Sequence, residues 1–175
     1  MTVSAVREQG ELLGCVGDVA PPPVGDGLGS VAGRRAVEDA AVALTGWDGF
    51  DFGQVVAPAV WRVCQDVFCR DPWLARLLAL PVEQVRHVRE AVYRTVEHYQ
   101  ADGELLAVAA LLTWASGADT DAAVAYATAA IQVGVDSGLA PLVIEAIDVG
   151  LPMDTWQMIC ADLSLDALRG TPTTT

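Results

Sequence analysis

The sequence predicts an all-α fold, a compact bundle of about six to eight short antiparallel helices. Apolar residues recur at spacings of three and four along most of the chain after residue 31, which is the helical period. Gly and Pro separate these stretches at short intervals, and helices joined by short turns pack as antiparallel neighbours. The hydrophobic fraction of 53% is ample for one buried core in a chain of 175 residues.

The first part of the chain differs in composition from the rest. Three consecutive prolines at 21–23 precede alternating glycines at 25–29. Pro-rich sequence followed by Gly-rich sequence makes a stiff spacer and then a flexible one. We therefore predict a flexible or extended segment at 1–30, a single helical domain at 31–168 and a disordered tail at 169–175.

The predicted domain opens with two helices around an aromatic loop. Residues 31–45 place alanine and aliphatic side chains on one side, and Gly46 closes this stretch. Glycines punctuate the aromatic residues at 47–53, which predicts a loop. Pro58 suits the first turn of the next helix, which we expect to run to about Phe68 with one apolar face.

Two further helices have recognisable boundaries. Asp71 followed by Pro72 is typical of a helix start, with an acidic N-cap before a proline at the first helical position. This helix is expected to end near Leu80. The stretch 82–100 carries a stripe of valines that ends at Tyr99, with charged residues on the opposite face, so it predicts an amphipathic helix.

The remaining helices carry less charge. Residues 104–116 are almost wholly apolar, which predicts a helix buried on most sides. Residues 120–135 are rich in alanine, and such small side chains let two helices approach closely, as in an antiparallel hairpin. Further helices are predicted at 141–149 and 153–163.

Part of this region resembles a known family. Residues 111–117 lead into Asp119 and the run of alanines, and the string ends with 147–152 and Trp156. It resembles the C-terminal part of the actinobacterial DUF4192 family, a domain of unknown function with a W-x-x-G-D turn, an Ala-rich helix and a D-x-G-L-P-P turn before Trp. The resemblance covers about a third of the chain, and Met153 replaces the second proline. It implies no activity, because its motifs are turns and packing residues.

The charge of the chain restricts its partners. The sequence has 23 acidic and 10 basic residues, a formal net charge of −13. Such a surface repels phosphate backbones and anionic lipid headgroups, so we expect neither nucleic acid nor membrane partners. All basic residues are Arg, and both Lys and Asn are absent. Because those two residues use A-rich codons, their absence indicates a high-GC bacterium, or a phage or plasmid living in one.

The cysteines and the N-terminal residues indicate a reducing compartment. Cys15, Cys64, Cys69 and Cys160 form neither a zinc motif nor a CxxC pair, with Cys64 and Cys69 on different faces of one predicted helix. We expect four free thiols that are mostly buried. The chain has no basic start before an apolar run and no apolar stretch of about 20 residues. The predicted location is therefore cytoplasmic.

No residue pattern predicts catalysis, a cofactor or a metal. His87 and His98 share an exposed helical face but lie roughly 16 Å apart along the axis, too far for one metal ion. The glycines at 25–30 fit no nucleotide-binding loop and lack the lysine of a P-loop. Asp48, Asp51 and Asp71 could gather a hard cation such as calcium, but the loop lacks the alternating ligands and the terminal Glu of an EF-hand. We expect no catalytic residues and no cofactor, and an enzyme is the less favoured class.

The sequence favours a non-enzymatic helical protein-interaction module that self-associates or docks a protein partner. Its predicted interaction residues are Trp114, Tyr126 and Trp156, because exposed aromatic side chains mark interfaces. One alternative is a small-molecule-binding helical domain, including an enzyme, with a ligand pocket between helices. Another is a phage or plasmid accessory protein whose acidity mimics nucleic acid.

Overall fold

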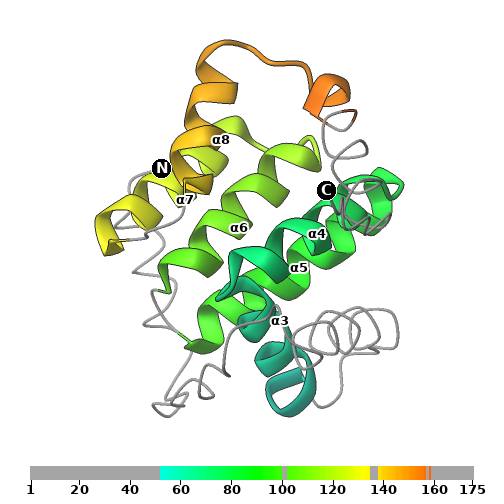
Figure 1. Ribbon diagram of the computed structural model, residues 1–175, viewed down its shortest axis with the longest axis vertical. Helices are drawn as coiled ribbons and strands as arrows, with labels where there is room; N and C mark the ends of the chain where they lie inside the picture. Colours follow the sequence, from blue (N-terminus) through cyan, green and yellow to red (C-terminus); the bar gives the residue numbers. More distant parts are fainter. Residues whose placement is uncertain (1–51, 100–101, 135–137, 157, 159–175) are drawn as a thin grey trace, which may run out of the picture.

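The computed structural model describes residues 52–99, 102–134, 138–156 and 158. Within these ranges the protein is all-α, as predicted, and contains no strand (Figure 1). The helices in chain order are a short π-helical turn η1 (Phe52–Val56), α3 (Ala57–Cys64), α4 (Val67–Leu78), α5 (Val82–Tyr99), α6 (Gly103–Ala115), α7 (Thr120–Val133) and α8 (Leu139–Asp148). The predicted spacer at 1–30, the predicted helix at 31–45 and the tail at 169–175 lie outside the described residues.

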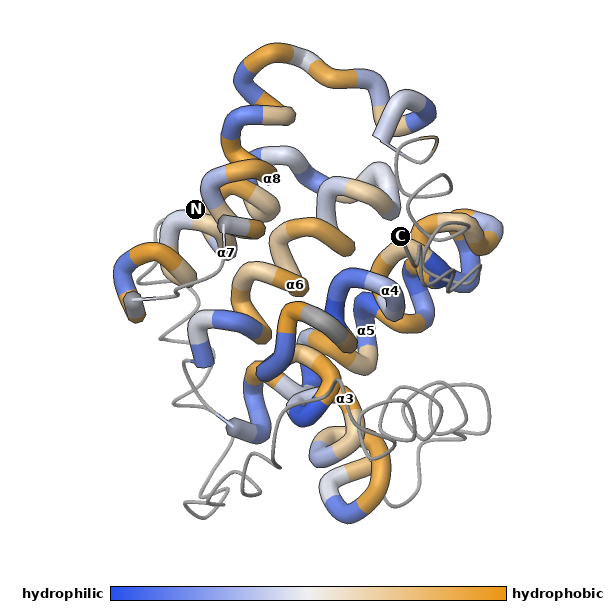
Figure 2. The backbone as a smooth tube through the Cα atoms, viewed as in Figure 1, coloured by the Kyte–Doolittle hydropathy of each residue, from blue (hydrophilic) through white to orange (hydrophobic). Residues whose placement is uncertain are grey.

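Helix α6 is the central element of the bundle. Helices α3, α5, α7 and α8 all pack against it. Every residue from Leu105 to Ala115 except Trp114 is buried, and Figure 2 shows hydrophobic colours along most of the helix. A helix that is apolar on all sides is stable in water only when neighbours enclose it. The prediction of a helix buried on most sides is confirmed.

Helix α5 shows the predicted amphipathic pattern. Its inward stripe includes Val85 and Val92, which are fully buried against the core. The opposite face is exposed, and there Arg94 Nε lies 3.5 Å from Glu90 Oε1, one turn earlier. His98 departs from the prediction because it is only partly exposed. Helical turn η1 covers this end of α5, and a Cβ added at Gly53 would lie 3.2 Å from His98 Cε1.

Helices α6 and α7 form the hairpin that the alanine-rich sequence predicts. Ala123, Ala127 and Ala130 recur at spacings of four and three and are fully buried on the inner face of α7. Their small size lets α7 lie close to α6, and these two helices share the most extensive contact in the described structure. Gly134 ends α7 with a φ of 93°, a left-handed conformation that glycine adopts without steric cost.

The predicted boundaries of α3 and α4 are wrong. Helix α3 ends at Cys64 instead of Phe68, and α4 already begins at Val67, so Asp71 is not an N-cap and Pro72 lies inside the helix. Pro72 is the sixth residue of α4, past the first turn, where proline removes one backbone hydrogen bond of the helix. The extra turn of α4 carries Arg70, which is 4% exposed and held by ion pairs.

Two tryptophans and two cysteines are buried in the core, while Cys15 and Cys160 lie outside the described residues. Trp61 and Trp73 anchor the core, with exposed fractions of 5% and 1%. Cys64 and Cys69 are buried free thiols, but they belong to α3 and α4 and not to one helix. No helix among the described residues is long and apolar enough to cross a membrane.

Candidate interaction surface

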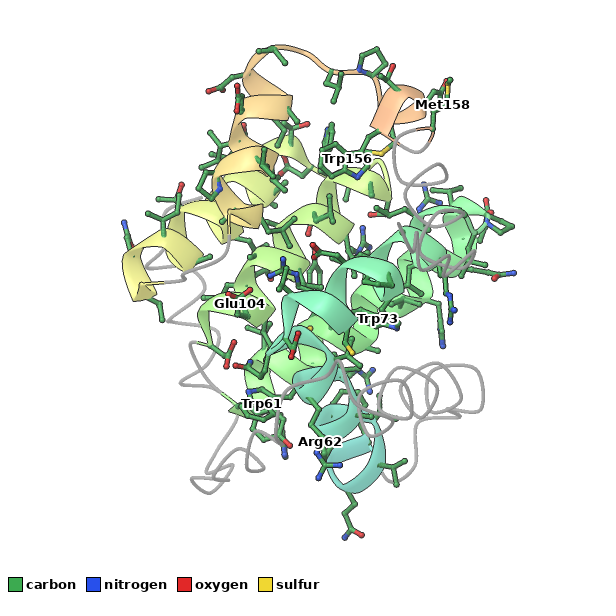
Figure 3. All side chains as sticks on the ribbon, in the orientation of Figure 1. Trp61, Arg62, Trp73, Glu104, Trp156 and Met158 are labelled. Carbon is green, nitrogen blue, oxygen red and sulfur yellow. The ribbon has the colours of Figure 1, made fainter. Side chains whose placement is uncertain are left out.

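The structure separates the three predicted interaction residues into two aromatic pairs. Trp114, in the last turn of α6, meets Trp156 edge to face with ring centroids 5.6 Å apart. Tyr126 of α7 instead stacks on Tyr93 of α5 at 5.2 Å. All three predicted residues are partly buried. Trp156 lies close to the bundle while Met158 lies at its outer edge (Figure 3). Their role as contacts for a partner stays a prediction.

Polar contacts around Tyr93 join α5 to the C-terminal end of α6. The Tyr93 hydroxyl hydrogen-bonds Thr113 Oγ1 of α6, and the Arg89 guanidinium carbon lies 5.5 Å from the centroid of the Tyr93 ring. Arg89 also donates to Ser116 Oγ at 2.7 Å, and Arg86 donates to the Ser116 carbonyl at 3.3 Å. Arginine at a helix C-terminus offsets the negative end of the helix dipole. These contacts therefore stabilise the end of α6.

The surroundings of Tyr126 favour its neutral hydroxyl, so we expect this tyrosine to lose its proton at a higher pH than an exposed tyrosine. Burial raises the pKa of Tyr126 from 10.0 to about 12; Tyr93 and Glu97 add to this rise, and Arg89 opposes it. Because the fold favours the neutral phenol, its contribution to stability is complete below pH 10 and is lost as the pH rises through about 12. We expect Tyr126→Phe to remove a late step from the ultraviolet titration of tyrosinate. Titration of all three tyrosines together near pH 10 would contradict this result.

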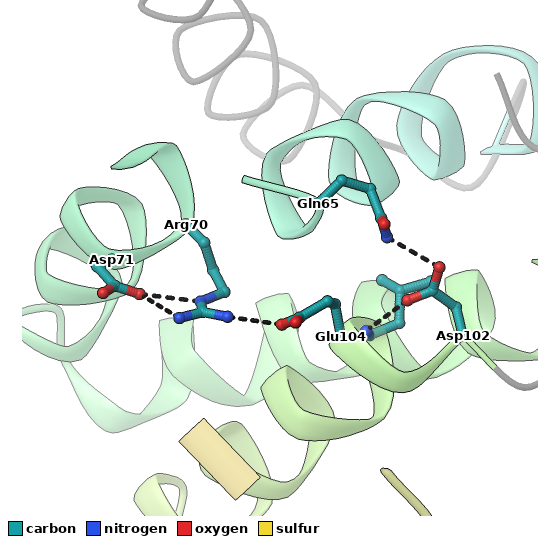
Figure 4. A network of polar contacts seen from close by, with 6 residues as sticks. Gln65, Arg70, Asp71, Asp102 and Glu104 are labelled. Carbon is teal, nitrogen blue, oxygen red and sulfur yellow. Dashed lines mark hydrogen bonds and ion pairs between the residues drawn. The ribbon is translucent and has the colours of Figure 1, made fainter. Parts of the chain in front are cut away.

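A second polar cluster lies where α3, α4 and the start of α6 meet (Figure 4). Arg70 NH1 lies 2.6 Å from Glu104 Oε2, and Arg70 NH2 lies 2.8 Å from Asp71 Oδ1. Asp102 is the N-cap of α6 and accepts a hydrogen bond from the Leu105 amide. Its other oxygen accepts from Gln65 Nε2 at 2.8 Å.

The side chains of this cluster hold the helices to one another. Trp61 Nε1 also donates to Asp102 at 2.9 Å, so both oxygens of this carboxylate have partners. Burial raises the pKa of the adjacent Cys64 thiol, and Asp102 raises it further. A thiol with a raised pKa stays protonated and is a poor nucleophile. Across the described ranges, no group of three or more His, Cys, Asp or Glu could hold a metal ion.

Helix α8 presents an apolar and acidic face to solvent. Its inner face, which includes Leu139, Val143 and Ala146, packs into the bundle. Its outer face carries Leu142, Glu145 and Asp148, and the C-cap residue Val149 follows them; we call these four exposed residues the α8 stripe. Leu142 is 49% exposed and Val149 is 70% exposed. They lie two helical turns apart, about 10 Å along the axis.

Most of the exposed large apolar side chains belong to the C-terminal part of the described sequence. Of the eight large hydrophobic residues exposed in the described structure, five fall between 131 and 158. They are Ile131, Val133, Leu142, Val149 and Met158. The other three are Val55, Val67 and Val82, in or at the start of η1, α4 and α5. Single exposed apolar residues are ordinary, and it is neighbouring ones, such as those of the α8 stripe, that indicate an interaction site.

Basic residues are also distributed unevenly along the sequence. The chain has no arginine or lysine between Arg94 and Arg169, and the only charged side chains of α6, α7 and α8 are acidic. Glu145 and Asp148 stand near the C-terminus of α8, where no basic residue lies in the last turn. Acidic side chains at this end face the negative pole of the helix dipole, an arrangement that typically costs roughly 0.3–1 kcal/mol per charge.

The α8 stripe was not found by sequence reasoning, although one feature of the sequence points to it. The long interval without arginine is visible in the sequence, but net charge alone does not show it. Comparisons with protein-family models, curated proteins and solved structures give no match for this chain. The resemblance to the DUF4192 family therefore stays a prediction.

Proposed function

We propose that the protein is a non-enzymatic helical interaction module that docks a protein partner through the α8 stripe. The observation that carries the proposal is the exposure of Leu142 and Val149 on a helix whose other face is buried. Burying apolar surface contributes roughly 25 cal/mol per Å², so a partner that covers this face gains free energy. The cytoplasm of a high-GC bacterium is the setting we propose.

The remaining polar chemistry of the described residues supports this class of function over catalysis. Arg70 and Asp102 are used in contacts between helices, and the Cys64 thiol is buried with a raised pKa. The partly exposed Trp114–Trp156 pair and Tyr126 are proposed as additional contacts for the partner. Aromatic side chains commonly supply much of the binding energy at protein interfaces.

The test is a comparison of two double variants of the tagged protein in a lysate of its own host. Leu142→Ser with Val149→Ser removes the apolar residues of the α8 stripe. Val55→Ser with Val82→Ser is the matched control, because it replaces two exposed valines elsewhere. We expect native mass spectrometry to find a protein partner on the wild type and the control that the α8 variant loses.

Either of two outcomes would contradict the proposal. Equal capture by both double variants would show that the partner binds elsewhere. A wild-type protein that is monomeric and carries no protein, or that carries only a small molecule, would favour the ligand-binding alternative. Circular dichroism of both variants supplies the folding control, and substitutions at exposed positions change stability little.

A further inference from the structure

We infer that the partner presents a basic amphipathic helix to the α8 stripe, an inference that rests on the proposed function. The spacing of the two apolar residues of the stripe indicates what kind of element binds there. Leu142 and Val149 are seven residues apart, so they lie on one line along α8. A helix that packs nearly parallel or antiparallel to α8 meets both residues with side chains spaced by one heptad.

The charge of the stripe gives the chemistry of the occupant. Glu145 and Asp148 flank the apolar residues, and neither has an ion pair among the described residues. Asp119, Asp121 and Asp154 are further acidic residues that are exposed. Interfaces favour complementary potentials, so arginine or lysine on the partner would face these carboxylates.

The C-terminus of α8 adds to this preference for a cation. The last carbonyl groups of a helix carry partial negative charge, and a cation nearby is favourable. Helix α6 has such cations, because Arg86 and Arg89 contact its final residues. The last turn of α8 contains no basic residue of its own and instead places two acidic side chains there. A basic side chain of the partner would supply the missing charge.

A second copy of this chain is a poor occupant of the same face. A symmetric dimer through the α8 stripe would place Glu145 and Asp148 of each copy beside those of the other. Helix α8 contains no basic residue, so the facing helix could not neutralise them. Like charges brought together across an interface oppose association.

Two designed helical peptides test the inference on the full-length protein. Both have leucine at the a and d positions; one carries arginine and lysine at the other positions, and its counterpart carries glutamate. We expect the basic peptide to bind in fluorescence anisotropy, more weakly as salt is added, and the acidic peptide not to bind. The variant Glu145→Gln with Asp148→Asn is expected to lower the affinity for the basic peptide at least about tenfold, because two charged contacts are lost.

A matched variant separates the α8 stripe from the overall acidity of the protein. Glu83→Gln with Glu97→Gln removes the same charge from exposed positions on α5 and should leave binding within about twofold. A thermal scan of the variant Glu145→Gln with Asp148→Asn measures its stability, which is expected to rise while its affinity for the peptide falls. Removing two acids from the negative end of α8 should raise the unfolding temperature, so weaker binding could not be attributed to unfolding.

The outcomes distinguish this inference from the proposed function. Three results would overturn the inference of a basic partner. The two charge variants could weaken binding of the basic peptide equally, the acidic peptide could bind, or neither peptide could bind. Sedimentation that shows a dimer lost on Leu142→Ser would also overturn it, in favour of a second copy. If the apolar variant loses its captured protein while Glu145→Gln with Asp148→Asn retains it, the proposed function stands and the basic partner fails.

Discussion

Replacing Arg70 with methionine is expected to lower the free energy of unfolding by about 3 kcal/mol. Arg70 is 4% exposed and joins α4 to α6 through Glu104, whose side chain is 19% exposed. The substitution keeps most of the volume but leaves the Glu104 carboxylate poorly solvated and without its cation. Urea denaturation followed by circular dichroism measures the loss.

Asp71→Asn is the control for this prediction. Asp71 also contacts Arg70, but its side chain is 57% exposed, so this pair is expected to contribute less than about 1 kcal/mol. Adding Glu104→Leu to Arg70→Met should recover part of the loss, because the unpaired carboxylate is removed. If Arg70→Met costs no more than Asp71→Asn, the ion pair with Glu104 does not hold α4 on α6.

Truncation of one buried side chain in the central helix α6 is expected to lower the free energy of unfolding by a similar amount. Leu112 of α6 is fully buried, and Leu112→Ala should cost about 3 kcal/mol, the loss of apolar contact plus the cavity that remains. Leu142→Ala makes the same chemical change on α8, where the side chain is 49% exposed, and should cost less than about 0.5 kcal/mol. Equal costs for the two variants in urea denaturation would contradict the central position of α6.

The sequence predicts α5 and α6 well because their patterns depend on burial alone. The valine stripe of α5 and the unbroken apolar run of α6 each allow one arrangement in a helical bundle. Helix α4 was mispredicted for a different reason. The Asp71-Pro72 pair satisfies the local rules for a helix start, but the ion pair of Arg70 with a residue far along the chain favours a longer helix.

The candidate surface was less predictable than the fold. Residue type alone predicts aromatic side chains at an interface. In the structure Trp114 pairs with Trp156, and Tyr126 pairs with Tyr93. These contacts depend on tertiary structure and cannot be seen in the sequence. Leu142 and Val149 resemble core residues in the sequence, because hydrophobicity does not show which face of α8 is covered. Only the packing of α8 against α6 and α7 decides this.

The most direct test of the α8 stripe as a docking surface is hydrogen exchange of the protein with and without its captured partner. The account predicts that binding slows amide exchange in peptides that cover Leu139–Asp148, while peptides from α4 and α5 exchange as before. Protection confined to η1, α3, α4 or α5, with α8 unchanged, would contradict it.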